Sequence, residues 1–207
     1  MSTRPRDTSA DAERVQRALR ERGSLAPLVA RLVPALEAAE LTYMIVGSVA
    51  AGIHGAPRDA PDLDLVIDGD RFEHRAFVSG LSDATYYVDR DRALEAWRAR
   101  GWFNLVDIET GYRVDLRVRR IHPFSREELA RRRTCPIEGV EAFVATAEDT
   151  ILGMLEWGHV RESAAIVVTQ RDALDRAYID RWARELGVES EWMRVARGLR
   201  DADGEPR

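Results

Sequence analysis

The sequence predicts an α/β protein whose core of strands and helices extends to about residue 145, followed by a helical part. In the core, short β-branched or alternating segments are separated by segments of helical spacing. After residue 145, apolar residues recur mainly at helical spacing. We therefore expect a flexible segment at 1–22, an α/β core at 23–145, a helical subdomain at 146–200 and a disordered tail at 201–207.

The first elements of the core follow from apolar spacing. The apolar residues between Leu25 and Leu36 recur at helical spacing, and Ser24 is a suitable N-cap. Pro34 should kink or split this helix because proline cannot donate a backbone hydrogen bond. Met44–Val46 has the pattern of a buried strand, and 49–54 can form a short helix behind it.

The later elements are predicted in the same way. Thr110-Gly111 should join two strands as a hairpin, and Ser125 with Glu128 resembles a capping box that opens a helix. Thr146 with Asp149 should start another helix that stops at Gly158. The remaining expected elements are a strand at 62–67, helices within 70–81 and 90–100, strands at 102–108 and 112–118, an edge strand at 140–144, and helices near 173–186 and 189–199.

A Gly47-Ser48 pair follows the predicted buried strand. Gly47 allows a sharp turn and close approach of the backbone to a ligand. Ser48 is a good N-cap for the short helix. The N-terminus of a helix offers unpaired N–H groups and a partial positive charge, so this turn is suited to a phosphate.

Two aspartates, Asp62 and Asp64, stand one residue apart on the next predicted strand. Alternate residues of a strand share a face, so both carboxylates should point the same way, roughly 7 Å apart. A cation between them would relieve their repulsion, and carboxylate oxygens favour Mg²⁺ or Mn²⁺. Asp115 lies on the alternating segment 112–118 and could complete a three-carboxylate cluster if that strand pairs beside 62–67. The alternative is a surface aspartate that forms salt bridges with Arg113 and Arg117.

These motifs together resemble the minimal nucleotidyltransferase superfamily, and more narrowly the AbiEii-like bacterial proteins of toxin–antitoxin and phage-defence systems. The resemblance covers roughly residues 25–187, and the Gly-Ser and D-x-D segment is its most specific part. It rests on Gly47-Ser48, His54–Arg58, Asp62–Val66, Val114–Leu116, Pro123–Glu128, Val144–Asp149 and Ala177–Ala183.

The resemblance implies a mixed sheet flanked by helices, with Gly47, Ser48 and Arg58 at the nucleotide. It also implies that Asp62, Asp64 and Asp115 are catalytic and ligate Mg²⁺ or Mn²⁺. Relatives often carry a lysine that reaches the nucleotide where this chain has Met154, and the sequence contains no lysine at all. Loss of this phosphate-binding charge argues against catalytic turnover, although one of the arginines could replace it.

Composition limits the other possibilities. The chain is 45% hydrophobic and 32% charged, which is typical of a soluble globular protein, and has no apolar run long enough to cross a membrane. The single cysteine, Cys135, excludes an internal disulfide, and the N-terminus does not have the pattern of a signal peptide. We therefore expect a cytoplasmic protein. The net charge of −5 does not favour broad nucleic-acid binding, although arginines between 113 and 133 could form a local basic rim.

Three functions remain open. The first is a metal-dependent nucleotidyltransferase that moves an NMP from an NTP to a hydroxyl of a tRNA, a protein or a small molecule. The second is a catalytically degenerate nucleotide- or partner-binding module that pairs with a cognate toxin or antitoxin. The third is a glycosyltransferase, in which a D-x-D also holds a metal; it ranks lowest because it does not explain Gly47-Ser48.

Overall fold

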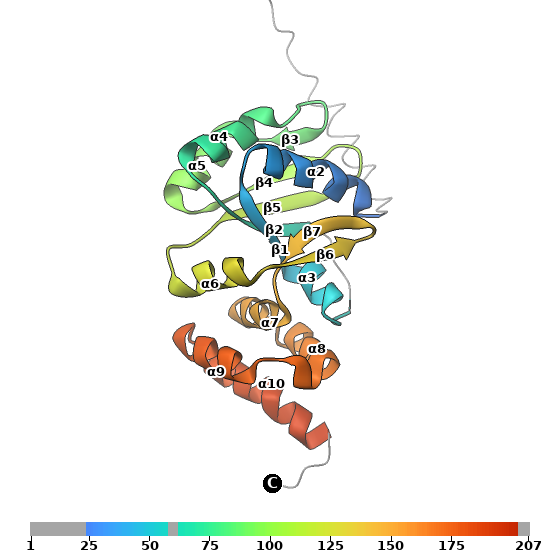
Figure 1. Cartoon of the computed structure of the whole chain (residues 1–207), viewed down its shortest axis with the longest axis vertical. Helices are drawn as coiled ribbons and strands as arrows, with labels where there is room; N and C mark the ends of the chain where they lie inside the picture. The colour runs from blue at the N-terminus through green and yellow to red at the C-terminus, as the bar shows by residue number, and fades with distance from the viewer. Residues whose placement is uncertain (1–23, 58–61, 203–207) are drawn as a thin grey trace, which may run out of the picture. The chain divides into compact units, whose positions relative to one another are not determined.

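The computed structural model describes residues 24–57 and 62–202, with side chains as far as Arg197 (Figure 1). It confirms the α/β class: in the described residues a seven-stranded mixed sheet has the strand order β3-β4-β5-β2-β1-β7-β6. The strands are β1 (Thr42–Val46), β2 (Asp62–Asp68), β3 (Tyr86–Val88), β4 (Trp102–Asp107), β5 (Arg113–Val118), β6 (Arg133–Ile137) and β7 (Val140–Val144). In this order β5, the strand of Asp115, is next to β2.

The chain divides into two compact units, which we describe separately. Unit 1 contains the described residues up to Tyr43, Ile67–Val118 and Cys135–Ala142. Unit 2 contains Met44–Val66, Arg119–Thr134 and the chain from Phe143 onward. The domain boundary that we placed near residue 145 stays a prediction. The segment 1–22 and residues 203–207 of the expected tail lie outside the described residues. Asp201 and Ala202 belong to the last helix (Glu189–Ala202), so the prediction that the disordered tail begins at 201 is wrong.

Unit 1 begins with helix α2 (Ala26–Ala38), which buries Leu28, Leu32 and Leu36. The helix is continuous through Pro34, so it is not split there, and the alternative that Pro34 kinks it stays a prediction. A proline forfeits one backbone hydrogen bond, and the buried apolar stripe on both sides of it keeps the helix intact. The helix also starts one residue later than predicted, because Leu25 rather than Ser24 occupies the N-cap.

Two further helices of unit 1 have acidic caps. Asp70 forms a capping box with Glu73 at the start of α4 (Arg71–Gly80), and Asp89 accepts from the backbone N–H of Arg92 at the start of α5 (Arg90–Ala99). A carboxylate at this position satisfies an N–H that the helix itself leaves unpaired. Figure 1 shows α4 and α5 beside strands β3 and β4.

The predicted hairpin of unit 1 is confirmed as an antiparallel pair of β4 and β5, in which Asn104 lies opposite Asp115. Asp107, fully buried, closes its turn by accepting from the N–H and hydroxyl of Thr110. Arg31 of α2 donates to both oxygens of Asp107, at 2.9 and 2.8 Å. The short strand β3 was not predicted from the sequence.

In unit 2, strand β1 runs parallel to β7, with Ile45 paired to Val144. The prediction that 140–144 is an edge strand is wrong, because β6 follows β7 in the sheet order. Strand β6 was not predicted because it contains Pro136 and follows a run of arginines. A proline is tolerated in an edge strand, where its missing N–H does not break a hydrogen bond to a neighbouring strand.

Helix α6 (Pro123–Arg131) starts earlier than the expected capping box. The ring of His122 occupies the N-cap and accepts from the N–H of Phe124, so Ser125 lies buried inside the helix and does not cap it. Proline is favoured in the first turn of a helix, where no N–H is needed, and this explains the earlier start.

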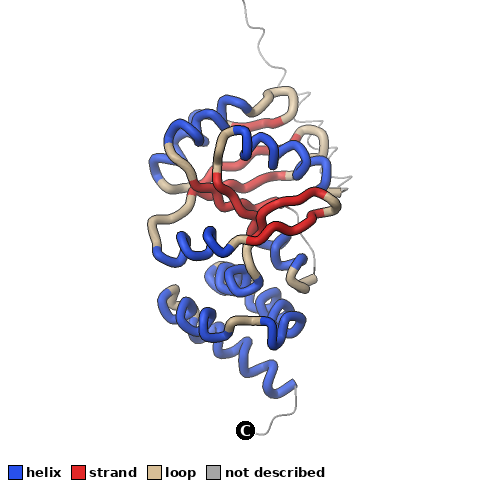
Figure 2. The backbone as a smooth tube through the Cα atoms, viewed as in Figure 1, coloured by secondary structure: helices blue, strands red, loops and turns tan. Residues whose placement is uncertain are grey.

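The part of unit 2 after residue 146 is helical, as predicted; Figure 2 shows helices and loops there. Thr146 caps α7 (Ala147–Glu156), and Gly158 follows with φ +81°. Helix α8 (Val160–Gln170) and a 3-10 turn, η1 (Arg171–Ala173), were not predicted, so α9 (Arg176–Glu185) starts later than expected. Helix α10 (Glu189–Ala202) completes a shared apolar core with Trp182 and Trp192. None of the helices in the described part of the chain is both long and apolar enough to cross a membrane.

Candidate functional site

The glycine-serine turn lies in unit 2, where β1 passes directly into helix α3 (Gly47–Ile53). Gly47 has φ +68°, a conformation in which side-chain-bearing residues are strained. This conformation lets the helix begin at Gly47 with Val46 at the N-cap. The prediction that Ser48 is the N-cap is therefore wrong: Ser48 lies half-buried in the first turn of the helix.

The side chain of Asp64 lies directly against Gly47. A Cβ atom placed on Gly47 would fall 2.9 Å from Cγ and 3.0 Å from Cβ of Asp64, and closer still to Oδ2. Such contacts are shorter than atoms tolerate, so Asp64 can hold this position only because residue 47 has no side chain. The structure thus brings the second aspartate of the D-x-D motif to the glycine-serine turn within one unit.

Asp62 and Asp64 share a face of β2, as the alternation predicted. Both are half-buried, whereas Leu63, Leu65 and Ile67 on the other face are at most 1% exposed. The apolar face fixes the register of the strand, since a slip of one residue would bury both carboxylates.

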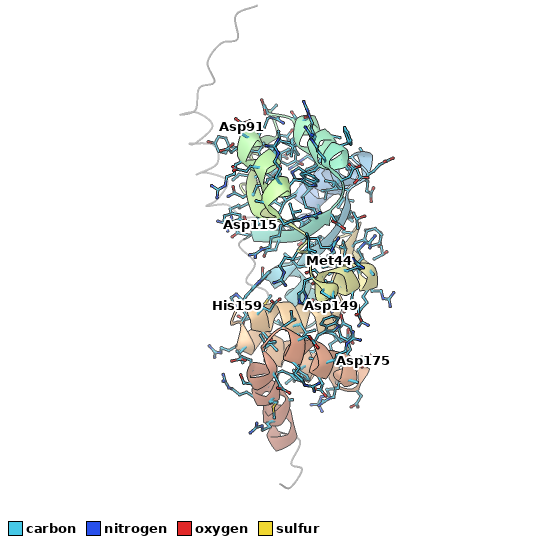
Figure 3. All side chains as sticks on the ribbon, turned by 90° about the vertical axis from the view of Figure 1, so that its left-hand side faces the viewer. Met44, Asp91, Asp115, Asp149, His159 and Asp175 are labelled. Atoms are coloured by element: carbon cyan, nitrogen blue, oxygen red, sulfur yellow. The ribbon has the colours of Figure 1, made fainter. Side chains whose placement is uncertain are left out.

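Asp115 belongs to unit 1, on β5, and is labelled in Figure 3. Its side chain is only 14% exposed, and Oδ2 accepts from Arg113 at 2.8 Å. Within the described residues, Oδ1 is buried and has no hydrogen-bond partner. A buried carboxylate oxygen without a partner is costly, which suits an atom that awaits a cation or a donor from a ligand. The convergence of Asp115 with Asp62 and Asp64 stays a prediction.

The donor chemistry of these residues fits a hard divalent cation. Carboxylate oxygens are the ligands that Mg²⁺ and Mn²⁺ prefer. The carboxylate of Asp64 occupies the space beside Gly47 that a side chain would otherwise fill. In the chain as far as it is described, no group of three or more His, Cys, Asp or Glu side chains is arranged as a metal site. The metal-ligand roles of Asp62, Asp64 and Asp115 therefore remain predictions.

The other residues singled out from the sequence have varied outcomes. Arg58 lies outside the described residues. The Nε2 atom of His54 lies 2.8 Å from the carbonyl oxygen of Ala145. Met154, where relatives often carry lysine, is 3% exposed in the core of unit 2. Trp182 is buried in the core of unit 2, whereas Trp157 is 37% exposed.

A network of buried charges in unit 2 was missed from the sequence. Asp149 accepts from the hydroxyls of Thr146 and Tyr178, at 2.6 and 2.5 Å. Arg131 lies within ion-pair distance of both Asp149 and Glu148, and its guanidinium stacks 3.9 Å above the ring of Tyr178. Glu148 is only 9% exposed, and its side chain accepts from the backbone N–H of Asp175.

Burial shifts the acids of this network unequally. It raises the pKa of Asp149, although hydrogen bonds from Thr146 and Tyr178 oppose the shift. The pKa of Glu148 is instead lowered, because the backbone N–H of Asp175 and neighbouring donors outweigh its burial. Burial raises the pKa of Glu128, on α6, to about 8, and the nearby charge of Asp149 adds to this. The signal in the sequence was the position of these acids at the apolar spacing of their helices.

Comparison with known protein families and curated proteins does not assign the chain to a family. No protein-family model matches the chain, and no curated protein sequence matches it. Six chains of solved structures match, among them an antigenic nucleotidyltransferase-like protein from Paracoccidioides brasiliensis. The match to that protein has a TM-score of 0.43 and 15% identity, and it covers 70% of this chain and 76% of that one. At this similarity the match carries no argument about function.

Proposed function

We propose that this protein is a metal-dependent nucleotidyltransferase. It would move a nucleoside monophosphate from an NTP to a hydroxyl of an RNA, a protein or a small molecule. One observation carries the proposal: the side chain of Asp64 lies against Gly47, at the turn that ends in Ser48. A nucleotidyltransferase needs a metal-binding carboxylate close to a turn whose backbone can approach a triphosphate.

In this proposal Asp62, Asp64 and Asp115 hold Mg²⁺ or Mn²⁺. The bound cation would lower the pKa of the attacking hydroxyl and neutralise charge on the triphosphate. Gly47 offers backbone without a side chain to the phosphates, Ser48 offers its hydroxyl, and Arg58 would supply a cationic clamp. The kinship to AbiEii-like proteins and the cytoplasmic location are parts of the same proposal.

The transfer itself is a displacement at phosphorus. The acceptor oxygen forms a bond to the α-phosphorus, the bond between the α-phosphorus and the α,β-bridging oxygen breaks, and pyrophosphate leaves with that electron pair. The proton of the acceptor hydroxyl passes to solvent or to a carboxylate of the site. The face of β2 that carries two half-buried carboxylates provides the negative charge that this proton transfer requires.

One observation favours a second function, a degenerate nucleotide- or partner-binding module of a toxin–antitoxin pair. Met154 is packed in the core of unit 2, so no cationic side chain extends from that position. A chain without lysine lacks the compact ammonium charge that commonly contacts phosphates. Such a module would bind the NTP and a cognate toxin or antitoxin without transferring the nucleotide.

A single experiment separates the two functions. The purified protein is incubated with each α-³²P-labelled NTP, Mg²⁺ and a cell extract, and the RNA and protein fractions are resolved on gels. A labelled band that requires Asp64 supports the enzyme. Binding of labelled NTP to the protein without any transferred label supports the module.

A further inference from the structure

The open face of the antiparallel sheet in unit 1 combines aromatic rings and arginines. Directly paired residues of neighbouring antiparallel strands share a face. The register therefore puts Tyr87 beside Val106 and Val106 beside Arg113. Four residues away along β4, Trp102 lies beside Arg117. We call Tyr87, Trp102, Arg113 and Arg117, with Arg92 described below, the aromatic platform.

Both rings of the aromatic platform are accessible. Tyr87 is 55% exposed and Trp102 is 50% exposed, whereas Phe103, Leu105, Val114 and Leu116 on the other face are almost fully buried. Exposing two large aromatic side chains on one sheet face forgoes the stabilisation that their burial would bring. An exposed aromatic surface of this kind is commonly a binding site.

Arginine side chains lie around these rings. Arg113 and Arg117 are exposed on β5, and the guanidinium of Arg92 lies 5.2 Å from the centre of the Trp102 ring. Asp115 lies between Arg113 and Arg117 on β5, and Arg113 pairs with it. Three arginines therefore border the two rings, although the chain carries a net charge of −5.

We propose that the aromatic platform binds single-stranded RNA, with bases stacked on Tyr87 and Trp102 and phosphates paired to the arginines. Stacking on aromatic rings and backbone contacts from arginine are the two interactions by which single strands are held. The rings are separated by four residues along the sheet, about 13 Å, which allows two different nucleotides of one strand to engage them. An acidic peptide would use the arginines but would leave both rings without a role.

RNA binding at the aromatic platform would make RNA the acceptor of the transferred nucleotide. This part of the inference rests on the proposed function. Asp115, to which we assign a role in catalysis, shares the face with both rings. A strand held on the platform would present its terminal hydroxyl on the same face of the sheet. The binding of RNA itself does not depend on any transfer of nucleotide.

The test is a direct binding measurement on the full chain. Fluorescence anisotropy of a fluorescein-labelled 12-nucleotide RNA of mixed sequence is followed at low salt, without NTP and with EDTA. The variants are Tyr87→Ala with Trp102→Ala, the conservative pair Tyr87→Phe with Trp102→Phe, and Arg117→Gln. Phe72→Ala, which removes a 78% exposed ring on α4, is the matched control. Circular dichroism and thermal melting verify that each variant is folded.

We expect the double alanine variant to bind at least tenfold more weakly, because it loses both rings on which bases would stack. The phenylalanine pair and Phe72→Ala should bind within about threefold of the wild type. Arg117→Gln should reduce the salt dependence of binding by about 0.7 in the log–log slope, corresponding to one phosphate contact on a single strand. Failure of the wild type to bind, or equal binding by a folded double alanine variant, would overturn the inference.

The two proposals fail in different ways. RNA binding without any transfer of nucleotide from NTP would contradict the proposed function but would still support the aromatic platform as an RNA-binding surface. Transfer to a protein or small molecule by a protein that does not bind RNA would defeat the platform alone.

Discussion

The side chain of Asp64 occupies the space that a side chain on Gly47 would need. An added Cβ atom would meet the carboxyl carbon of Asp64 at 2.9 Å, and Gly47 itself adopts φ +68°. The glycine is therefore required both by the backbone conformation of the turn and by the carboxylate beside it. This relationship links the two sequence motifs on which the proposed function depends.

Gly47→Ala should disable the site by displacing the Asp64 carboxylate. The positive φ adds roughly 1–2 kcal/mol of strain, so the variant should also unfold at lower urea concentration. Nucleotide transfer, measured with labelled NTP, should fall by at least tenfold. Gly153→Ala is the control in the same unit, because Gly153 lies within α7 and an added Cβ meets nothing within 4 Å. That variant should be neutral or slightly more stable, and equal activity of both variants would contradict this account.

Glu128→Gln should change how stability depends on pH. The folded chain holds the Glu128 proton up to a pKa of about 8, whereas an unfolded glutamic acid releases it near 4.5. Between these values the folded state binds the extra proton, so the free energy of unfolding falls as the pH rises, by at most about 1.4 kcal/mol per pH unit. Urea denaturation at pH 5.5 and pH 7.5 should show a smaller loss for the glutamine variant than for the wild type. The control, Glu127→Gln, changes a partly exposed neighbour, and an unchanged pH dependence in Glu128→Gln would refute the prediction.

Arg131→Gln should be among the most destabilising single changes in unit 2. It leaves the carboxylates of Glu148 and Asp149 buried without their cation and removes the stacking on Tyr178. Removing one partner of a buried pair costs about 3–5 kcal/mol. Arg181→Gln, which removes an exposed pair with Glu127, should cost less than about 1 kcal/mol. Chemical denaturation followed by circular dichroism measures the free energy of unfolding of both variants. Similar decreases in the two variants would show that the ion pairs of Arg131 contribute no more than an exposed pair.

Cys135 should be dispensable. Burial raises the pKa of its thiol, which disfavours the reactive thiolate. Cys135→Ser should retain full transfer activity, and the wild type should react slowly with a thiol reagent at pH 7.5. A loss of transfer in the serine variant would assign the cysteine a role that the proposed function does not include.

Local patterns predicted the motif elements well. The alternation in 62–67 and 112–118 predicted which residues face the core, and the structure confirms both. The same kind of reasoning cannot locate Asp64 against Gly47, because that contact depends on tertiary packing between β2 and the turn after β1. The local pattern predicted the turn itself. It indicated Ser48 rather than Val46 as the N-cap, because the positive φ of Gly47 cannot be inferred from the sequence.

The elements that were missed have weak local signals. Strand β3 has three residues, and β6 contains Pro136 in a run of polar residues. Helix α8 includes Val167 and Val168, β-branched residues that are more typical of strands, and it is held by its packing on α7. The network around Arg131 was missed because charged residues in a helix are usually exposed, and burial becomes visible only when α6, α7 and α9 are assembled.

The most direct test of the central claim compares Asp64→Asn with the wild type in the labelled-NTP assay containing Mg²⁺. Asp83→Asn, an exposed aspartate paired with Arg90, is the control. We predict transfer of label by the wild type and the control, a loss of at least a hundredfold in Asp64→Asn, and loss of transfer by the wild type in EDTA. Equal transfer by a folded Asp64→Asn variant would contradict the account.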